Sequence, residues 1–256
     1  MNSKKCDSNC FYDNISGQYD NIFELKEELA SAGTFIAKLQ KRYKLERALD
    51  IGCGTGRFAL AMAQKGINSY GFDPSSLMIE KAEENASKLN LKVDFFQGDT
   101  NNMVCNLTVL RFDLILCMGN TIAHLLDRED LFSMLIGCKR LLKPGGKLIL
   151  NLLNYDRILN QKERIVGITR QDDKEFIRFY DFKKSFLKFN LLEINWEDKS
   201  PKHQIFSTKL YPYTHSEVLS ALAEADFREC KLYDGIELNE FNLEKSSSLL
   251  IEATRK

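Results

Sequence analysis

The chain has 256 residues, of which 36 are Lys or Arg and 36 are Asp or Glu, so its formal net charge at pH 7 is zero. Apolar residues make up 44% of the chain, and the charge balance gives no support to binding nucleic acid or a membrane surface through bulk charge. No stretch approaches the roughly 18 apolar residues of a membrane span, and the polar first ten residues lack the pattern of a secretory signal. We therefore expect a cytoplasmic protein without nucleic-acid or membrane partners.

Short apolar runs alternate with amphipathic stretches along the first three fifths of the chain. A helical region is expected at about 20–44, and strands are expected at 47–51, 69–72, 93–97, 112–118 and 147–153. Helices are expected at about 57–65, 75–89 and 128–142, because their apolar residues recur every three or four positions. Strands that alternate with helices in this way indicate a doubly wound α/β sheet with mostly parallel strands.

The pattern changes after the fifth strand. Residues 155–210 contain aromatic and β-branched residues at short spacing, which predicts an antiparallel insertion. Thr214 and Glu217 form a capping box that starts a further helix, and two strands at about 228–233 and 247–254 follow. We expect a seven-stranded sheet with one reversed strand. The predicted organisation is a helical cover at 1–45, a core at 46–154 and 211–256, and a substrate lid at 155–210.

The most informative segment follows the first strand and reads Asp50-Ile51-Gly52-Cys53-Gly54-Thr55-Gly56. Glycines let the backbone approach a ligand closely, and the acid that ends the second strand, Asp73, reaches ribose hydroxyls in this topology. A nicotinamide or flavin dehydrogenase would place its third glycine three positions after the second, and no phosphate-binding Gly-Lys-Ser/Thr follows. Asp50 would repel a phosphate, but it suits a ligand with an ammonium and a sulfonium, such as S-adenosylmethionine.

With these residues the chain resembles the class I S-adenosylmethionine-dependent methyltransferases over about residues 45–155. The segment from Asp50 to Gly56 is similar to their first motif, and Asp73 is similar to their ribose-binding acid. Gln97-Gly98-Asp99-Thr100 is similar to the motif whose acid contacts adenine, and the segment that ends in Lys143-Pro144-Gly145-Gly146 is similar to their "L-K-P-G-G" turn. The resemblance implies a Rossmann-like methyltransferase fold with S-adenosylmethionine as cofactor.

A narrower resemblance follows the fourth and fifth strands. The segment from Cys117 to Leu125 is similar to a "C-x-G-N-S-x-x-H-L" segment of glycine and sarcosine N-methyltransferases, and Asn154 begins a match to their "N-Y-D-x-I-L". The resemblance implies that Asn120 and His124 border the active cleft and that Asn154 contacts a substrate carboxylate. Leu153 replaces that family's arginine, so the identity of the acceptor stays open.

The remaining candidates lie near the ends of the predicted lid and cover. Tyr12 and Tyr19 precede the first long helix, and in similar methyltransferases an N-terminal tyrosine covers the sulfonium; ordinary packing is an equal alternative. Tyr213 leads from the insertion into the last helix, where similar enzymes close over substrate. The seven cysteines form no disulfide framework or complete metal motif, so we expect free thiols and no bound metal.

The sequence thus predicts an enzyme that transfers the methyl group of S-adenosylmethionine to a small-molecule acceptor by in-line displacement, with an amine or amino-acid nitrogen favoured. An O-methyltransferase of a small metabolite and a cofactor-binding protein without catalysis stay open as alternatives, as does the oligomeric state. The predicted site residues form three groups: catalytic His124 and Tyr19; cofactor-binding Tyr12, Asp50, Gly52, Gly54, Gly56, Asp73, Asp99, Thr100 and Cys117; and substrate-binding Asn120, Asn154 and Tyr213.

Overall fold

The structure is a computed structural model that describes residues 11–16, 19, 25–99, 107, 109–197 and 200–256. Residues 11–16 are helical. The further helices are α2 (Leu25–Arg42), α3 (Arg57–Gln64), α4 (Ser76–Lys88), α6 (Arg128–Leu141), α7 (Tyr155–Gln161) and α8 (His215–Glu224), with 3-10 turns η1 (Thr121–His124) and η2 (Gly235–Glu237). The strands are β1 (Arg47–Ile51), β2 (Asn68–Asp73), β3 (Val93–Gln97), β4 (Phe112–Cys117), β5 (Leu142–Leu153), β6 (Ile165–Gln171), β7 (Lys174–Phe182), β8 (Leu187–Asn195), β9 (Lys202–Leu210), β10 (Phe227–Asp234), β11 (Asn239–Glu240) and β12 (Ser248–Arg255).

The main sheet has the strand order β11-β10-β12-β5-β4-β1-β2-β3. Strands β1 to β5 pair in parallel, whereas β12 runs antiparallel between β5 and β10. The strand order reverses at β1, which lies between β2 and β4, and ligands of doubly wound sheets bind at the carboxyl ends beside such a point. The predicted fold class is confirmed, with β11 as a two-residue addition to the seven expected strands.

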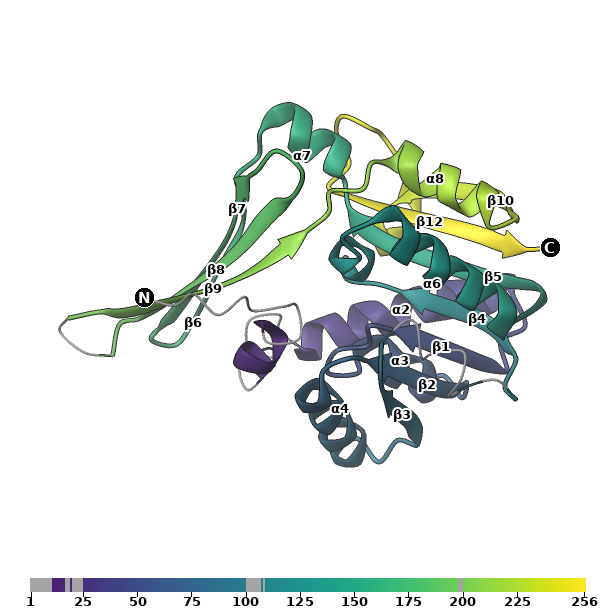
Figure 1. Cartoon of the computed structure of the whole chain (residues 1–256). Helices are drawn as coiled ribbons and strands as arrows, with labels where there is room; N and C mark the ends of the chain where they lie inside the picture. Colours follow the sequence, from purple (N-terminus) through teal and green to yellow (C-terminus); the bar gives the residue numbers. More distant parts are fainter. Residues whose placement is uncertain (1–10, 17–18, 20–24, 100–106, 108, 198–199) are drawn as a thin grey trace.

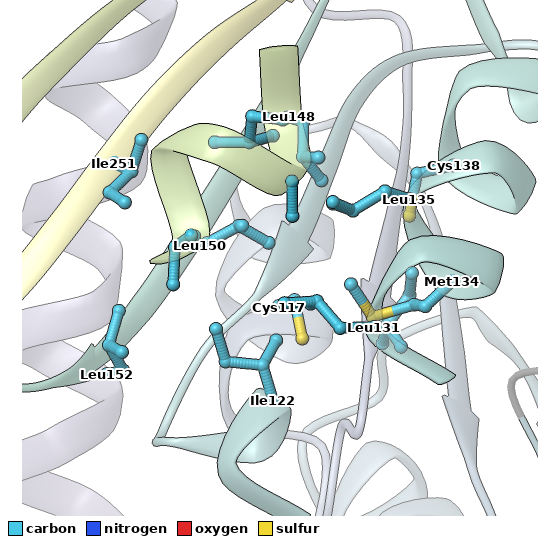
Figure 2. Packing of buried hydrophobic residues seen from close by; sticks show 14 of the residues in the cluster. Cys117, Ile122, Leu131, Met134, Leu135, Cys138, Leu148, Leu150, Leu152 and Ile251 are labelled. Carbon is cyan, nitrogen blue, oxygen red and sulfur yellow. The ribbon is translucent and has the colours of Figure 1, made fainter. Parts of the chain in front are cut away.

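The two faces of this sheet carry separate hydrophobic clusters because side chains alternate along each strand. In β4, Ile115 and Cys117 pack on one face, whereas Leu114 and Leu116 pack on the other. Helices α6 and α8 cover the first face, where Leu131, Met134 and Leu135 of α6 meet Leu148 and Leu150 of β5 (Figure 2). Helices α2 and α3 cover the second face. The sheet is therefore the middle layer of three.

A second, antiparallel sheet has the order β6-β7-β8-β9 and extends from the core (Figure 1). One of its faces contributes Phe176 and Leu191 to a cluster with Phe11 and Ile15 of the N-terminal helical segment and Met78 of α4. The N-terminal segment therefore lies between the antiparallel sheet and the α4 edge of the core. An antiparallel insertion after the fifth strand is confirmed as part of the fold.

Two local features differ from the sequence prediction. Residues 155–161 form helix α7, because the Asn154 side chain caps it at the backbone N–H of Arg157. The predicted turn at Pro144-Gly145-Gly146 is an irregularity inside β5, where the register with β4 shifts between Phe112 and Leu114. Gly145 has φ +77° at this point, a conformation that glycine adopts without strain.

Candidate active site

The turn after β1 is held in a conformation that glycine alone adopts easily. Gly52, Gly54 and Gly56 have φ values of +66°, +53° and +94°. A Cβ atom on Gly52 would lie 2.4 Å from the Thr121 side chain, and one on Gly56 would lie 3.1 Å from Phe95. At Gly54 the nearest atoms belong to the Tyr19 ring, 3.9 Å away. Packing therefore leaves no room for a side chain at Gly52 or Gly56, whereas Gly54 has more open space beside its Cα atom.

Asp73 at the end of β2 lies beside the glycine turn. Its carboxylate accepts hydrogen bonds from the backbone N–H groups of Gly54 at 2.9 Å and Ser75 at 3.0 Å. Burial raises the pKa of Asp73 to about 6, although these two backbone bonds oppose the shift and Asp13 adds to it. The Asp73 carboxylate and the half-buried backbone of Gly54 are therefore adjacent at the carboxyl ends of β1 and β2.

Asp50 lies deeper in the molecule, with 1% of its surface exposed. Burial raises its pKa to about 8, while the nearby Arg57 guanidinium and a hydrogen bond from the backbone of Ala59 oppose the increase. Ala59 belongs to the first turn of α3, so the carboxyl group stabilises the start of this helix. The predicted contact between Asp50 and a ligand ammonium stays a prediction.

The N-terminal segment approaches the turn from the opposite side. Ser75 donates its hydroxyl to Asp13 at 2.6 Å, and the Tyr12 and Tyr19 rings lie 6.2 Å apart, centre to centre. Because the Tyr19 ring lies over Gly54, two of the predicted tyrosines are brought to the glycine turn. Asp13 was not among the predicted site residues, and only its place beside Tyr12 in the sequence could have indicated it.

His124 ends the 3-10 turn η1, which follows β4. Its Nε2 atom lies 2.8 Å from the Tyr12 hydroxyl, and its buried Nδ1 atom has no hydrogen-bond partner among the described residues. Burial lowers the pKa of His124 to about 4, so the imidazole is neutral at pH 7. Burial also raises the pKa of Tyr12 above its usual value. Two residues that are 112 positions apart thus form one neutral hydrogen-bonded pair.

Asn120 connects η1 to the insertion. It has φ +70° and donates its side-chain amide to the Tyr155 hydroxyl at 2.7 Å, while its oxygen accepts from the backbone N–H of Leu153. Tyr155 interacts in turn with the hydroxyl of Tyr180 in β7, and burial raises the pKa of both tyrosines. Sequence reasoning missed Tyr155 and Tyr180, because only the fold brings β7 to the end of β5.

Residues 48–146, which include the glycine turn, Asp73 and His124, match the family described as "Methyltransferase domain". The chain is therefore similar to this family over 99 of its 256 residues. The prediction that the chain resembles S-adenosylmethionine-dependent methyltransferases is thereby confirmed.

Curated proteins similar to this chain include enzymes named for different acceptors. A glycine/sarcosine N-methyltransferase of Aphanothece halophytica is 31% identical over 144 residues, which cover 56% of this chain and 54% of that protein. A ubiquinone biosynthesis O-methyltransferase of Actinobacillus pleuropneumoniae is 30% identical over 142 residues, 52% of this chain and 59% of that protein. The chain therefore matches little more than half the length of these relatives.

A solved structure extends the likeness of fold beyond residues 48–146. An S-adenosylmethionine-dependent methyltransferase from Clostridium acetobutylicum has a TM-score of 0.78 and 17% identity, and the match covers 95% of this chain and 98% of that one. The fold, with its antiparallel insertion, is thus shared along almost the whole chain. At 17% identity this structure shows a likeness of fold alone.

Asn154 and Tyr213, for which the sequence predicts substrate contacts, use their side chains for hydrogen bonds within the fold. The Asn154 amide donates to the carbonyls of Leu243 and Ser246, its oxygen caps α7, and the residue is 1% exposed. The Tyr213 hydroxyl lies 2.8 Å from the Leu125 carbonyl oxygen, and the residue is 2% exposed. Both side chains therefore join segments of the fold, and we expect them to stabilise it rather than to contact substrate.

The last predicted cofactor contacts lie at the ends of β3 and β4. Cys117 is fully buried, and its side chain packs in the cluster beneath α6, so only its backbone remains available to a ligand (Figure 2). Asp99 follows β3 and is exposed, whereas Thr100 lies outside the described residues. The described residues contain no cluster of three or more metal-ligating side chains, and none of their helices has the length and apolar composition of a membrane span.

Proposed function

We propose that the chain is an S-adenosylmethionine-dependent methyltransferase whose acceptor is a small molecule. The observation that carries the proposal is the glycine turn with Asp73 bonded to the Gly54 backbone, inside the residues that match a methyltransferase domain. When bound, the cofactor supplies a methyl group on a sulfonium, which is already activated toward displacement by a nucleophile. The protein therefore needs chiefly to hold the reacting groups in line.

The turn and Asp73 fit the cofactor in shape and in hydrogen-bonding capacity. Gly54 has no Cβ and faces only the side chain of Tyr19, so the backbone can lie against a ligand. Each Asp73 oxygen accepts one backbone hydrogen bond, and a carboxylate oxygen has capacity for a second, which suits ribose hydroxyls. We propose that Gly54 and Asp73 bind the cofactor, and that Gly52 and Gly56 shape the turn.

On the acceptor side, we propose that His124, Tyr12 and Tyr19 position the nucleophile. A histidine with a pKa of about 4 is a weak base, so it is better suited to accept a hydrogen bond than to remove a proton from an ammonium. This favours an amine that arrives uncharged, in keeping with the N-methyltransferase named among the relatives. The unpartnered Nδ1 atom is the group we propose to contact the acceptor.

Two alternatives have support of their own. The relatives include an O-methyltransferase, and the Tyr12–His124 pair offers a route for hydrogen bonding to a hydroxyl acceptor. A protein that binds the cofactor without catalysis would keep the glycine turn and Asp73. It would have no need of the neutral, buried His124.

Cofactor titration tests the first part of the proposal. Wild-type protein should bind S-adenosylmethionine, and Asp73→Ala should weaken binding by about 1.5–3 kcal/mol, as expected for hydrogen bonds to a charged group. Asp94→Ala, an exposed acid on the adjacent strand β3, is the matched control and should bind as wild type. Equal affinities for the two variants would contradict the ribose assignment.

A competition screen tests the acceptor. Small amines, amino acids, phenols and carboxylic acids should compete with tRNA, DNA and bulk protein for the methyl group of labelled cofactor. We expect transfer to a small amine. Transfer only to a macromolecule would overturn the small-molecule proposal. Cofactor binding without transfer to any member of the screen would favour the non-catalytic alternative.

A further inference from the structure

The two faces of the antiparallel sheet differ in their surroundings. Alternate residues such as Phe176, Tyr180 and Leu191 point to the face that meets the N-terminal segment, and they are at most 2% exposed. The residues between them point to the opposite face, which we call the outer face. In Figure 1 the helical segment at 11–16 lies on the core side of this sheet. An antiparallel sheet with one packed face normally places polar residues on the other.

The outer face instead carries an apolar band between charged residues. Cross-strand pairing places Ile168 opposite Ile177, Ile177 opposite Leu192, and Leu192 opposite Ile205, so one apolar row crosses all four strands. Ile168 and Ile205, at the two ends of the row, are 58% and 55% exposed to solvent. The whole outer apolar surface comprises Ile165, Ile168, Ile177, Phe179, Leu192, Ile194 and Ile205. A contiguous exposed surface of this kind marks an interaction site.

We propose that the outer face binds the outer face of a second copy of the chain, forming a two-fold symmetric dimer. A two-fold axis parallel to the strands would place β6 over the partner's β9 and β7 over the partner's β8. Ile168 would then face Ile205, Ile177 would face Leu192, and Asp181 would face Lys188. The same surface is self-complementary in this orientation, as an isologous interface requires.

Charged residues on the outer face favour a two-fold axis parallel to the strands over one perpendicular to them. Asp181 and Arg164 lie beyond one side of the apolar row, where they form an ion pair at 2.9 Å. Glu175 and Arg170, which pair across β7 and β6, lie beyond the other side. An axis perpendicular to the strands and midway between these pairs would bring acid against acid and arginine against arginine, which is unfavourable.

The sheet is large enough for such an interface. Strands of up to nine residues, at about 3.3 Å per residue, extend about 30 Å, and four strands about 4.8 Å apart extend about 19 Å. A face of these dimensions covers about 570 Å², so two copies would bury about 1,100 Å² in total, near the lower limit for a specific interface. The expected dimer is therefore of moderate affinity.

The first test is the mass of the protein in solution, measured by light scattering or sedimentation over a range of concentrations. We expect twice the 29.5 kDa of one chain for the wild type. Ile168→Lys should weaken the dimer about a hundredfold or more by placing a charge against the apolar row. Leu243→Lys, at a residue that is 43% exposed outside this sheet, should leave the dimer intact. A wild-type monomer, or a dimer that Ile168→Lys does not weaken, would overturn the proposal.

The second test uses the proposed facing of Asp181 and Lys188. Asp181→Lys alone brings like charges together across the two-fold axis, and Lys188→Asp alone does the same with acids, so both variants should dimerise less tightly than the wild type. Mixing the two folded variants should restore a dimer, because every facing pair in the mixed species is then of opposite charge. Mixing does not restore opposite charges at residues 181 and 188 within either chain, so a restored dimer reports the contact between the two copies. A mixture no tighter than its components would overturn the proposed orientation.

Discussion

The two sides of the proposed active site are built in different ways. Around Gly54, the bonds come from backbone groups within a short stretch of chain, from the end of β1 to Ser75. Around His124, the contacts come from side chains of segments far apart in the sequence, such as Tyr12 and Tyr155. The Gly54 side therefore depends on the backbone conformation of the turn. The His124 side depends on the packing of the insertion and the N-terminal segment.

Substitutions in the glycine turn should have the largest effects on the free energy of unfolding and on cofactor binding. Gly52→Val combines a positive φ with a collision against Thr121, and we expect a loss of about 3–5 kcal/mol in the free energy of unfolding. Gly54→Val has open space beside it, so this protein should fold with a smaller loss and fail to bind the cofactor. Denaturant unfolding and cofactor titration measure the two effects.

Gly66→Val provides the control for backbone strain alone. Gly66 has φ +78°, and no atom lies within 4 Å of a Cβ built there. We expect this variant to lose about 1–2 kcal/mol, the usual cost of a side chain in the left-handed region. If Gly52→Val is no less stable than Gly66→Val, packing against Thr121 does not fix the turn.

Asn154→Ala should separate a structural role from a substrate contact. The substitution removes the cap of α7 and leaves the carbonyls of Leu243 and Ser246 without their donor. We expect a loss of about 2–3 kcal/mol in stability, with the KM for the acceptor unchanged. A raised KM with unchanged stability would restore the sequence-based assignment of Asn154 to the substrate.

Asp50→Asn should change how stability depends on pH. Because the folded-state pKa of Asp50, about 8, lies above the ordinary value of an aspartate, 3.8, the folded protein binds this proton more tightly than the unfolded chain does. The stabilisation is complete below about pH 4 and is lost as pH rises toward 8. The asparagine cannot titrate, so the difference between wild type and variant should vary by at least about 1.4 kcal/mol over this range, equivalent to one pKa unit. A constant difference in unfolding free energy from pH 4 to 8 would contradict the burial argument.

Tyr12→Phe should have the smallest effect. It removes one hydrogen bond to His124, for which we expect about 0.5–1.5 kcal/mol of stability, and it leaves cofactor affinity close to that of the wild type. Tyr70→Phe in β2, where the ring stacks on Phe96, measures the general effect of losing a tyrosine hydroxyl. Equal losses in the two variants would mean that the Tyr12–His124 bond adds no stability.

The same contrast explains what could be predicted from the sequence. The glycine turn and Asp73 were predicted because local spacing defines a turn after one strand and an acid at the end of the next. The apolar run at 112–118 predicted β4, whose side chains are buried on both faces, almost to the residue. Periodicity of this kind is a local property, so it can be read without knowledge of the tertiary fold.

Features that depend on distant partners were not predictable in this way. The resemblance implied a substrate role for Asn154, but its partners are carbonyls about 90 positions later in the chain. Helix α7 has only seven residues, too short for a clear period, and its start depends on that same asparagine. Tyr180 reaches Tyr155 only after β7 has folded against the start of α7. None of these contacts has a signature in sequence spacing.

The position of β12 has a consequence for how the chain folds. It is the last strand in chain order, yet it pairs with β5 on one side and β10 on the other, about 100 residues from β5. Strands β10 and β11 therefore have no link to the rest of the sheet until residues 248–255 have left the ribosome. Such late, long-range pairing slows folding and leaves the β5 edge open in the nascent chain. Residues 48–146, which match the methyltransferase family, are synthesised before this strand, so the parallel strands among them can begin to assemble while that edge is still uncovered.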